Sequence, residues 1–444
     1  LSPAGARFEV LGNCLLPGNG KFSLLAAAGT GLHAWKVSLL ADAVLAKDWG
    51  GLAVEGLDWN EAQVKVQAFA AGTDLDVHQV VVDGTASLAS LRSTVPRLDT
   101  HAIAVRFNGD LASGLRCAIT GAETHGSFAM EILAEQDAQQ QPRVRLQAVT
   151  TAAEVTAETL TWLRELLPEV GDILLAIEPR GFPRTAFDCT WSEANGFAWS
   201  LQVDPNGTSV TYRGILDDED NRFSFPYPAT NNQGNVVACK DAVLFHGAGM
   251  VGGNSGGSGH ASATGIIDFR NDGFLAIDIK AEAVPLDRRI SGALTGNPVV
   301  ADLWRNLGNP EQGLADLDVE IRLQEQEFKV RVAGDASDIK VRPAMLPLQA
   351  DVDHAWFEWV PGIARFGASM TALGGGLWLD GNVREVANRE APDLRLTLRG
   401  RGFDAKPSEL RILESYLPLP EGLAQFALSG KVFYDLSLVL PLDH

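Results

Sequence analysis

The stretch that decides the fold of this chain is Leu317-Asp-Val319-Glu-Ile321-Arg-Leu323, followed after four polar residues by Phe328-Lys-Val330-Arg-Val332. Apolar and charged side chains alternate with a period of two, which places the apolar ones on one face of an extended strand. The two runs and the polar connection between them predict a β-hairpin with one apolar face and one hydrated face.

The same alternation recurs along the chain. It is found in the five segments Val64–Ala68, Val144–Leu146, Leu275–Ile279, Leu394–Leu398 and Leu436–Leu440. Asn271-Asp272-Gly273 lies between Ile266–Phe269 and Phe274–Ile279 and is typical of a tight hairpin turn with positive φ. A parallel sheet would instead need continuous apolar strands and regular helices. We therefore predict an antiparallel all-β fold with a few short amphipathic helices.

A helix, a Pro–Gly turn and a set of strands recur as a unit. Helices are predicted at 151–167, 297–307 and 408–417, and the strands that follow them at 173–178, 317–323 and 426–432. A weaker first copy precedes a strand at 22–26. The predicted organisation is repeat 1 at 1–150, repeat 2 at 151–245, a Gly/Ser-rich flexible loop at 246–260, repeat 3 at 261–400 and the start of repeat 4 at 401–444.

The composition limits the classes of partner. The 444 residues carry a formal net charge of −20, which is unsuited to nucleic acid and is repelled by anionic lipid headgroups. The chain contains no apolar run long enough to span a bilayer and begins without Met, so we expect a fragment or a mature form. Cys14, Cys117, Cys189 and Cys239 show no metal-ligand spacing, and two disulfides or four reduced thiols fit them equally well.

Two segments have features of catalytic or metal sites. Gly253-Asn-Ser255-Gly-Gly257 resembles the nucleophile segment of trypsin-like and HtrA-like serine proteases, but no upstream segment resembles the histidine motif of that family. A flexible Gly/Ser loop explains it better. Asp351-Val-Asp353-His354 is the one local cluster of ligand-like residues, and a solvated strand face explains it better than a metal site. We predict no enzymatic activity, no cofactor and no metal.

The apolar face of such a sheet must be covered. It either packs shut against a second layer, as in a sandwich, or curves into an open gutter that holds lipid tails, which is favourable by about 0.8 kcal/mol per buried CH₂. The aromatic residues Trp356, Phe357 and Trp359 fit either a core corner or the entrance of a groove. The residues predicted to line a lipid groove are Leu275, Ile277, Ile279, Leu317, Val319, Ile321, Leu323, Phe328, Val330, Val332, Leu394, Leu396, Leu398, Leu436, Leu438 and Leu440.

The repeated unit resembles the AsmA-like superfamily of bacterial envelope proteins, which includes the TamB and YhdP relatives. The resemblance is carried by Ala301-Asp-Leu-Trp304-Arg-Asn-Leu307-Gly-Asn-Pro310-Glu-Gln-Gly313 and by Leu413-Glu-Ser-Tyr416-Leu-Pro-Leu-Pro420-Glu-Gly422. It implies an elongated, curved, taco-like β-groove in the periplasm, held to the inner membrane by an anchor outside this chain. It also implies transport of phospholipid between membranes, with no catalytic residues. The missing anchor and the loop at 246–260 depart from the family pattern.

The expected function is therefore non-enzymatic binding and conduction of phospholipid or another acyl lipid along a hydrophobic β-groove between envelope membranes. Its expected partners are the lipid, the inner membrane and outer-membrane or other envelope proteins. The alternative is a structural or adhesive cell-envelope repeat protein whose apolar face is packed shut. A hydrolase centred on Ser255 is the third hypothesis.

Overall fold

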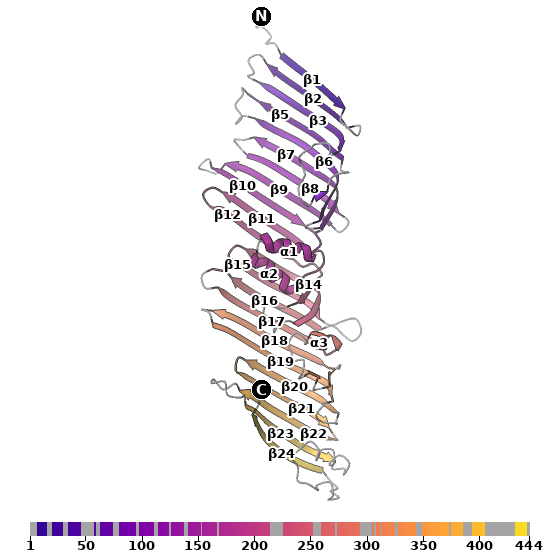
Figure 1. Cartoon of the computed structure of the whole chain (residues 1–444), viewed down its shortest axis with the longest axis vertical. Helices are drawn as coiled ribbons and strands as arrows, with labels where there is room; N and C mark the ends of the chain where they lie inside the picture. The colour runs from indigo at the N-terminus through magenta and orange to yellow at the C-terminus, as the bar shows by residue number, and fades with distance from the viewer. Residues whose placement is uncertain are drawn as a thin grey trace. The chain divides into compact units, whose positions relative to one another are not determined.

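The structure of the chain is a computed structural model, and its described residues form 24 strands and three helices. The described residues are 7–15, 20–29, 34–45, 57–58, 63–73, 80–94, 97–110, 114–123, 126–136, 141–151, 153–166, 168–213, 225–251, 259–270, 273–293, 304–305, 308–310, 312–324, 327–342, 349–372, 374–384, 393–404 and 431–441. They confirm the predicted fold class, an all-β protein with an open, curved antiparallel sheet and few helices (Figure 1).

The chain divides into two compact units. Unit 1 comprises 1–171, 180–208 and 235–240, and unit 2 comprises 172–179, 209–234 and 241–444. The strands of unit 1 are β1 Arg7–Leu15, β2 Lys21–Gly29, β3 Trp35–Leu45, β4 Leu57–Asp58, β5 Gln63–Gly72, β6 Val81–Thr94, β7 Arg97–Asp110, β8 Gly114–Glu123, β9 Gly126–Gln136, β10 Pro142–Thr150, β11 Arg184–Ser192 and β12 Gly196–Asp204. The strands of unit 2 are β15 Ala242–Val251, β16 Gly259–Asp268, β17 Phe274–Pro285, β18 Leu314–Gln324, β19 Glu327–Val341, β20 Ala350–Val360, β21 Ile363–Ala372, β22 Gly375–Arg384, β23 Asp393–Asp404 and β24 Lys431–Pro441. β13 Thr208–Tyr212 and β14 Phe225–Cys239 contribute residues to both units.

The hairpin predicted from the alternating stretch is present as β18 and β19. Leu323 lies opposite Phe328, Ile321 opposite Val330, and Val319 opposite Val332, so the apolar residues of both strands share a face. The rest of each sheet is built in the same way, because successive strands in the chain pair with each other antiparallel. In unit 1 the pairing runs from β1 to β12, with the two-residue strand β4 paired to β6. In unit 2 it runs from β15 to β24.

The described helices are α1 Ala157–Leu166, α2 Pro168–Ile177 and α3 Arg288–Ala293. α1 confirms the helix predicted at 151–167, and the hydroxyl of Thr156 caps it by accepting a hydrogen bond from the backbone N–H of Thr159. The strand predicted at 173–178 is wrong, because α2 includes residues 173–177. Pro168 occupies the first helical position of α2, where its missing N–H has no helical partner to lose.

The predicted loop at 246–260 is too wide. β15 continues to Val251 and β16 begins at Gly259, so both ends of the Gly/Ser-rich stretch are strand. Residues 252–258, including Ser255, lie outside the described residues, as do Asn271 and Asp272 of the predicted turn, although Gly273 has the expected positive φ of 76°. Of the helix predicted at 297–307, Trp304 and Arg305 are described and helical, and the helix at 408–417 lies outside the description.

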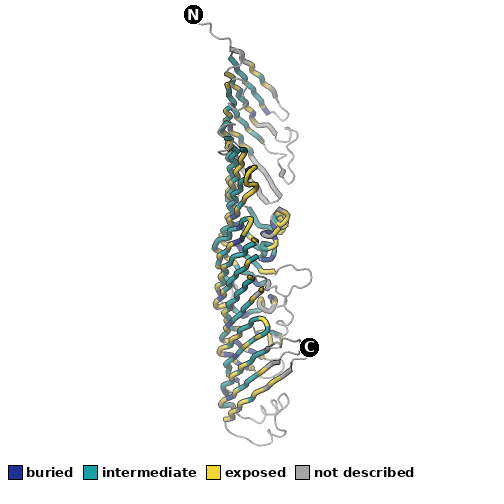
Figure 2. The backbone as a smooth tube through the Cα atoms, turned by 90° about the vertical axis from the view of Figure 1, so that its left-hand side faces the viewer, coloured by how far each residue is buried: buried dark blue, intermediate teal, exposed yellow. Residues whose placement is uncertain are grey.

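A buried apolar cluster lies near the β17, β19 and β20 ends of unit 2. We call it the covered end, and its members include Val284, Leu286, Ala293, Ile339, Val341, Ala350, Val352 and Ala372. Ala293 belongs to α3, and Leu286 donates its backbone N–H to the carbonyl of Gly313. A helix and its approach segment therefore supply the second layer at this end of the strands. Elsewhere along the described strands most residues are half-buried or exposed (Figure 2).

Local register shifts interrupt the ladders at five places among the described strands. They fall between Ala41 and Val44 and between His101 and Ala104 in unit 1. In unit 2 they fall between Ala281 and Val284, Val352 and His354, and Arg401 and Phe403. Each leaves extra residues on one strand, which bends the strand and resets which residues point to which face. The division of the chain into two units does not test the predicted repeat boundaries, which stay a prediction.

Candidate functional site

One face of the unit 2 sheet is apolar from strand to strand. Residues directly opposite each other in neighbouring antiparallel strands share a face, and we call a line of them a row. One row crosses eight strands from β17 to β24 and consists of Ile279, Val319, Val332, Trp359, Ala364, Val383, Leu394 and Leu440. The next row consists of Ala281, Leu317, Gly334, Phe357, Phe366, Gly381, Leu396 and Leu438. Neither row contains a charged residue.

The backbone register places all the predicted groove-lining residues on this apolar face. Leu275, Ile277 and Ile279 of β17 lie opposite Leu323, Ile321 and Val319 of β18, which extends the rows above. Leu398 and Leu436 face each other in the same way on β23 and β24. The side chains of Phe328, Leu394, Leu438 and Leu440 lie outside the described residues. Whether these residues line a lipid groove stays a prediction.

The degree of burial separates two parts of this face. At the covered end, Ile339 and Val352 face each other and are 9% and 5% exposed. Away from that end, two rows are only half-buried. These two rows, Ile277, Ile321, Val330 and Ile279, Val319, Val332, are named the open rows here. Side chains in the middle of a sandwich core would be buried by the opposing sheet. The open rows have the apolar composition of a core without its complete cover.

Unit 1 has an equivalent face, of which the alternating segments in the sequence predict only fragments. One of its rows crosses β1 to β12 and consists of Gly12, Leu24, Leu39, Ala68, Gly84, Phe107, Cys117, Ile132, Leu146, Cys189 and Trp199. Small residues occupy many positions of this face, so the strands lack the Leu/Val/Ile alternation that revealed unit 2. The signal present in the unit 1 sequence is a weaker alternation, in which an uncharged residue of any size alternates with a polar one. That pattern could have predicted this face.

The thiols of Cys117, Cys189 and Cys239 are free. Cys117 and Cys189 share the row just described but are separated in it by Ile132 and Leu146, so they are too far apart for a disulfide. Burial raises the pKa of the Cys189 thiol. Cys239 lies opposite Ser200, on the other face, and the side chain of Cys14 lies outside the description. Cys117 and Cys189, which lie on the apolar face, serve there as small apolar residues.

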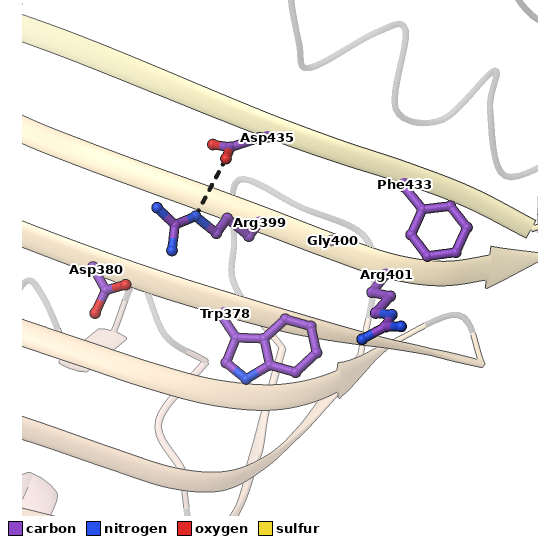
Figure 3. Close-up of a pocket in the computed structure, with 7 residues that line it drawn as sticks. All are labelled: Trp378, Asp380, Arg399, Gly400, Arg401, Phe433 and Asp435. Atoms are coloured by element: carbon purple, nitrogen blue, oxygen red, sulfur yellow. Dashed lines mark hydrogen bonds and ion pairs between the residues drawn. The ribbon is translucent and has the colours of Figure 1, made fainter.

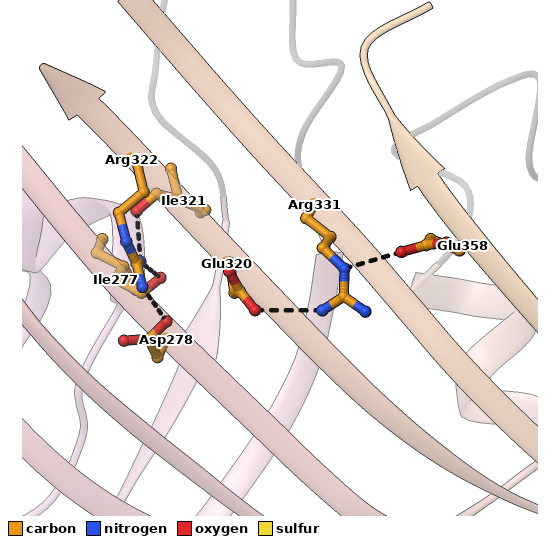
Figure 4. Close-up of polar contacts among 7 residues, drawn as sticks. All are labelled: Ile277, Asp278, Glu320, Ile321, Arg322, Arg331 and Glu358. Atoms are coloured by element: carbon orange, nitrogen blue, oxygen red, sulfur yellow. Dashed lines mark hydrogen bonds and ion pairs between the residues drawn. The ribbon is translucent and has the colours of Figure 1, made fainter. Parts of the chain in front are cut away.

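The opposite face of each sheet is polar and carries cross-strand ion pairs. In unit 2 the Arg331 guanidinium donates to Glu320 at 3.1 Å and to Glu358 at 3.0 Å, and that of Arg322 donates to Asp278 at 2.5 Å (Figure 4). In unit 1 the Arg145 guanidinium lies 2.7 Å from a carboxylate oxygen of Asp188 and holds the pKa of that carboxyl below its usual value. The two faces of one sheet therefore differ in charge as well as in hydropathy.

A shallow hollow of about 610 Å³ lies on the polar face of β22 to β24 (Figure 3). Trp378, Phe433, Arg399 and Arg401 contribute to its lining, with Asp380, Gly400 and Asp435. The Arg401 guanidinium lies 6.0 Å from the centre of the Phe433 ring, and the Arg399 guanidinium pairs with Asp435 at 3.3 Å. The hollow is open, so it does not enclose a substrate.

No group of three or more metal-binding side chains occurs among the described residues. The register shift after Val352 places His354 on the same face as Asp351, so the prediction that those two residues point to opposite faces is wrong. His354 lies 3.0 Å from Asp335, and the Thr371 hydroxyl donates to Asp353. Phe357 and Trp359 lie on the apolar face, and Trp356 lies on the polar one.

Among the residues that the structure describes, no helix is long and apolar enough to cross a bilayer. Comparisons with protein-family models, with curated proteins and with solved structures found no match to this chain.

Proposed function

We propose that this chain binds phospholipid or another acyl lipid on its apolar sheet face and lets it move along that face between membranes of a bacterial envelope. The observation that carries the proposal is the half-buried apolar row of Ile279, Val319, Val332, Trp359, Ala364 and Val383, which crosses six consecutive strands. In unit 2 the open rows join Ile277 to Val330 and Ile279 to Val332 without a charged residue.

The energetics of hydrocarbon transfer support this ligand. Moving an acyl chain from an apolar environment into water costs about 0.8 kcal/mol for each CH₂. A protein surface that accepts the chain from a membrane must therefore be nearly as apolar as the membrane. Leucine, valine and isoleucine side chains meet that requirement. Because the open rows repeat Ile and Val side chains from strand to strand, no position within them binds a chain much more tightly than its neighbour, which favours movement over retention. The half-buried state leaves contact area that a guest would cover.

The location and partners belong to the same proposal. The resemblance of the helix and Pro–Gly segments to the AsmA-like superfamily supports a periplasmic protein held to the inner membrane by a segment outside this chain. Outer-membrane or other envelope proteins are then the partners that would receive or deliver the lipid. The net charge of −20 fits contact with lipid through apolar surface better than through anionic headgroups. No catalytic step is part of the proposal.

The test compares two aspartates introduced at neighbouring positions of one strand. Ile277→Asp places a charge in an open row, and Ala276→Asp places the same charge on the polar face, opposite Arg322. Lipid that co-purifies with each variant is extracted with organic solvent and quantified by mass spectrometry. We expect Ile277→Asp to lose its phospholipid while remaining folded by circular dichroism, and Ala276→Asp to keep it. Val319→Asp should repeat the first result.

Two outcomes would contradict the proposal. Wild-type protein that carries no lipid and takes up no labelled acyl chain would exclude it. Unfolding of Ile277→Asp and Val319→Asp, with Ala276→Asp still folded, would favour the structural or adhesive alternative, in which these rows are packed shut.

A further inference from the structure

Glycines on the apolar faces recur directly opposite aromatic residues. Five such pairs are Trp35 with Gly72, Phe107 with Gly84, Phe245 with Gly265, Phe357 with Gly334 and Phe366 with Gly381. In each pair the ring lies over the glycine, where a Cβ would otherwise be. The glycine thus accepts the ring of its cross-strand neighbour.

The geometry is clearest at Gly334. A Cβ added there would lie 2.9 Å from Cζ and 3.1 Å from Cδ1 of Phe357, and closer still to Cε1. At Gly381 an added Cβ would lie 2.9 Å from Cε1 of Phe366. Neither glycine has a positive φ, so it is the ring above each of them, and not its backbone, that requires glycine.

Two of the pairs form one arrangement in a single row of unit 2. The row runs Gly334, Phe357, Phe366, Gly381 across β19 to β22, and the two phenylalanines are direct cross-strand neighbours. Each ring lies over the glycine on its outer side, so the two rings point away from each other. Both rings lie along the sheet instead of standing up from it. We call these four residues the aromatic floor.

We propose that the aromatic floor is a specificity-determining seat for an extended acyl chain, which lies across the faces of the two rings. This inference rests on the proposed lipid function and specifies the ligand as a linear hydrocarbon chain. A standing phenylalanine would obstruct the face at this row. A ring lying flat gives the chain a broad apolar surface with little height, and Phe357 has 43% of its surface exposed for such contact.

The test uses a photoreactive fatty acid that carries a diazirine in its chain, with the sites of attachment mapped by peptide mass spectrometry. In Gly334→Val the new side chain displaces the Phe357 ring away from the sheet. We expect the yield of adducts on β20 and β21 to fall about tenfold, the effect of losing contact with about two methylene groups. The yield on β17 and β18 should stay unchanged.

The polar face supplies a matched control. Trp356 lies opposite Gly367, and an added Cβ at Gly367 would lie 2.8 Å from Cε2 of the indole, so Gly367→Val creates a similar clash on the other side of the same sheet. This variant should leave all adduct yields unchanged. The double variant Gly334→Val with Phe357→Ala removes the Phe357 ring altogether, so it should lose the β20 and β21 adducts to the same extent as Gly334→Val.

The outcomes separate the two proposals. Wild-type adducts on β17 and β18 together with unchanged β20 and β21 adducts in Gly334→Val would overturn the aromatic floor and leave lipid binding standing. An equal loss in Gly367→Val would also overturn it, because the effect would then be a general disturbance of the sheet. Wild-type protein without adducts on any strand would overturn both.

Discussion

The covered end and the open rows of unit 2 are made of the same residue types on the same sheet face, yet they differ in what lies above them. Ile339 and Val352 are buried under the segment that contains Leu286 and Ala293, whereas Ile321 and Val319 are only half-buried. Neighbouring strands can cover only part of a side chain, and a second layer must cover the rest. The contrast separates residues that hold the fold together from residues that remain available to a guest.

The largest expected difference follows from a charge placed in each region. Val352→Asp buries an unpaired carboxylate in the covered end and should lower the free energy of unfolding of unit 2 by about 3 kcal/mol or more. Val319→Asp should lower it by about 1 kcal/mol, because its carboxylate can remain partly hydrated. Guanidinium unfolding followed by circular dichroism measures both. Equal losses would show that the open rows are packed as tightly as the covered end.

Truncation to alanine should give the same order, with a larger loss of stability at the covered end than in the open rows. Ile339→Ala leaves a cavity in a buried cluster and should destabilise by about 2–4 kcal/mol. Ile321→Ala removes a half-buried side chain and should cost about 1 kcal/mol. The same unfolding experiment compares them, with binding of a labelled fatty acid as a second measurement. We expect Ile321→Ala to weaken binding and Ile339→Ala to leave it unchanged at temperatures where the variant is folded.

The polar face should contribute less than either region. Arg331→Gln removes two partly exposed ion pairs, with Glu320 and Glu358, and should lower stability by less than Ile321→Ala does. The loss should disappear when unfolding is repeated in about 1 M salt, which screens exposed charges. A loss that persists at high salt would mean that Arg331 acts through packing of its aliphatic part.

The smallest expected effect concerns pH. Hydrogen bonds from Arg270 lower the pKa of Asp268 to about 2, below its unfolded value of about 3.9. The contribution of this carboxylate to stability is therefore fully present above about pH 4 and is lost as the pH falls through about 2. Asp268→Asn should be less stable than wild type at pH 5 and indistinguishable from it at about pH 1. A difference that does not change between these pH values would assign the effect to something other than ionisation.

Much of unit 2 could be predicted from its sequence because large apolar residues alternate there with charged ones. The β18–β19 hairpin follows from that alternation with its pairing register, since Gln324 and Glu327 close it and a shift by one residue would move every apolar side chain to the wrong face. The same two-residue alternation predicts that the groove-lining residues share one face. The cover at the covered end could not be predicted, because the short helix α3 has no periodic apolar pattern of its own.

The errors arose where composition was ambiguous. Ile173-Leu-Leu-Ala-Ile177 is continuously apolar, which fits a buried strand or a buried helix, and burial of Val170 and Ala176 in α2 favours the helix. The glycines of 246–251 suggested a loop, but Gly249 lies in β15 opposite Ala261, where small residues let neighbouring segments approach closely. The unit 1 face was recognised only in fragments because alanine, glycine and cysteine carry little hydrophobic signal.

The register shifts have a consequence for how such a chain tolerates insertions and deletions during evolution. In a regular strand, gaining or losing one residue moves every later side chain of that strand to the opposite face of the sheet. Gaining two residues leaves each later side chain on its original face. At the shift between Val352 and His354 the strand already accommodates an odd residue, Asp353, with apolar Val352 and Ala355 on the same side. Single-residue length changes should therefore accumulate at these five places, and changes of two elsewhere.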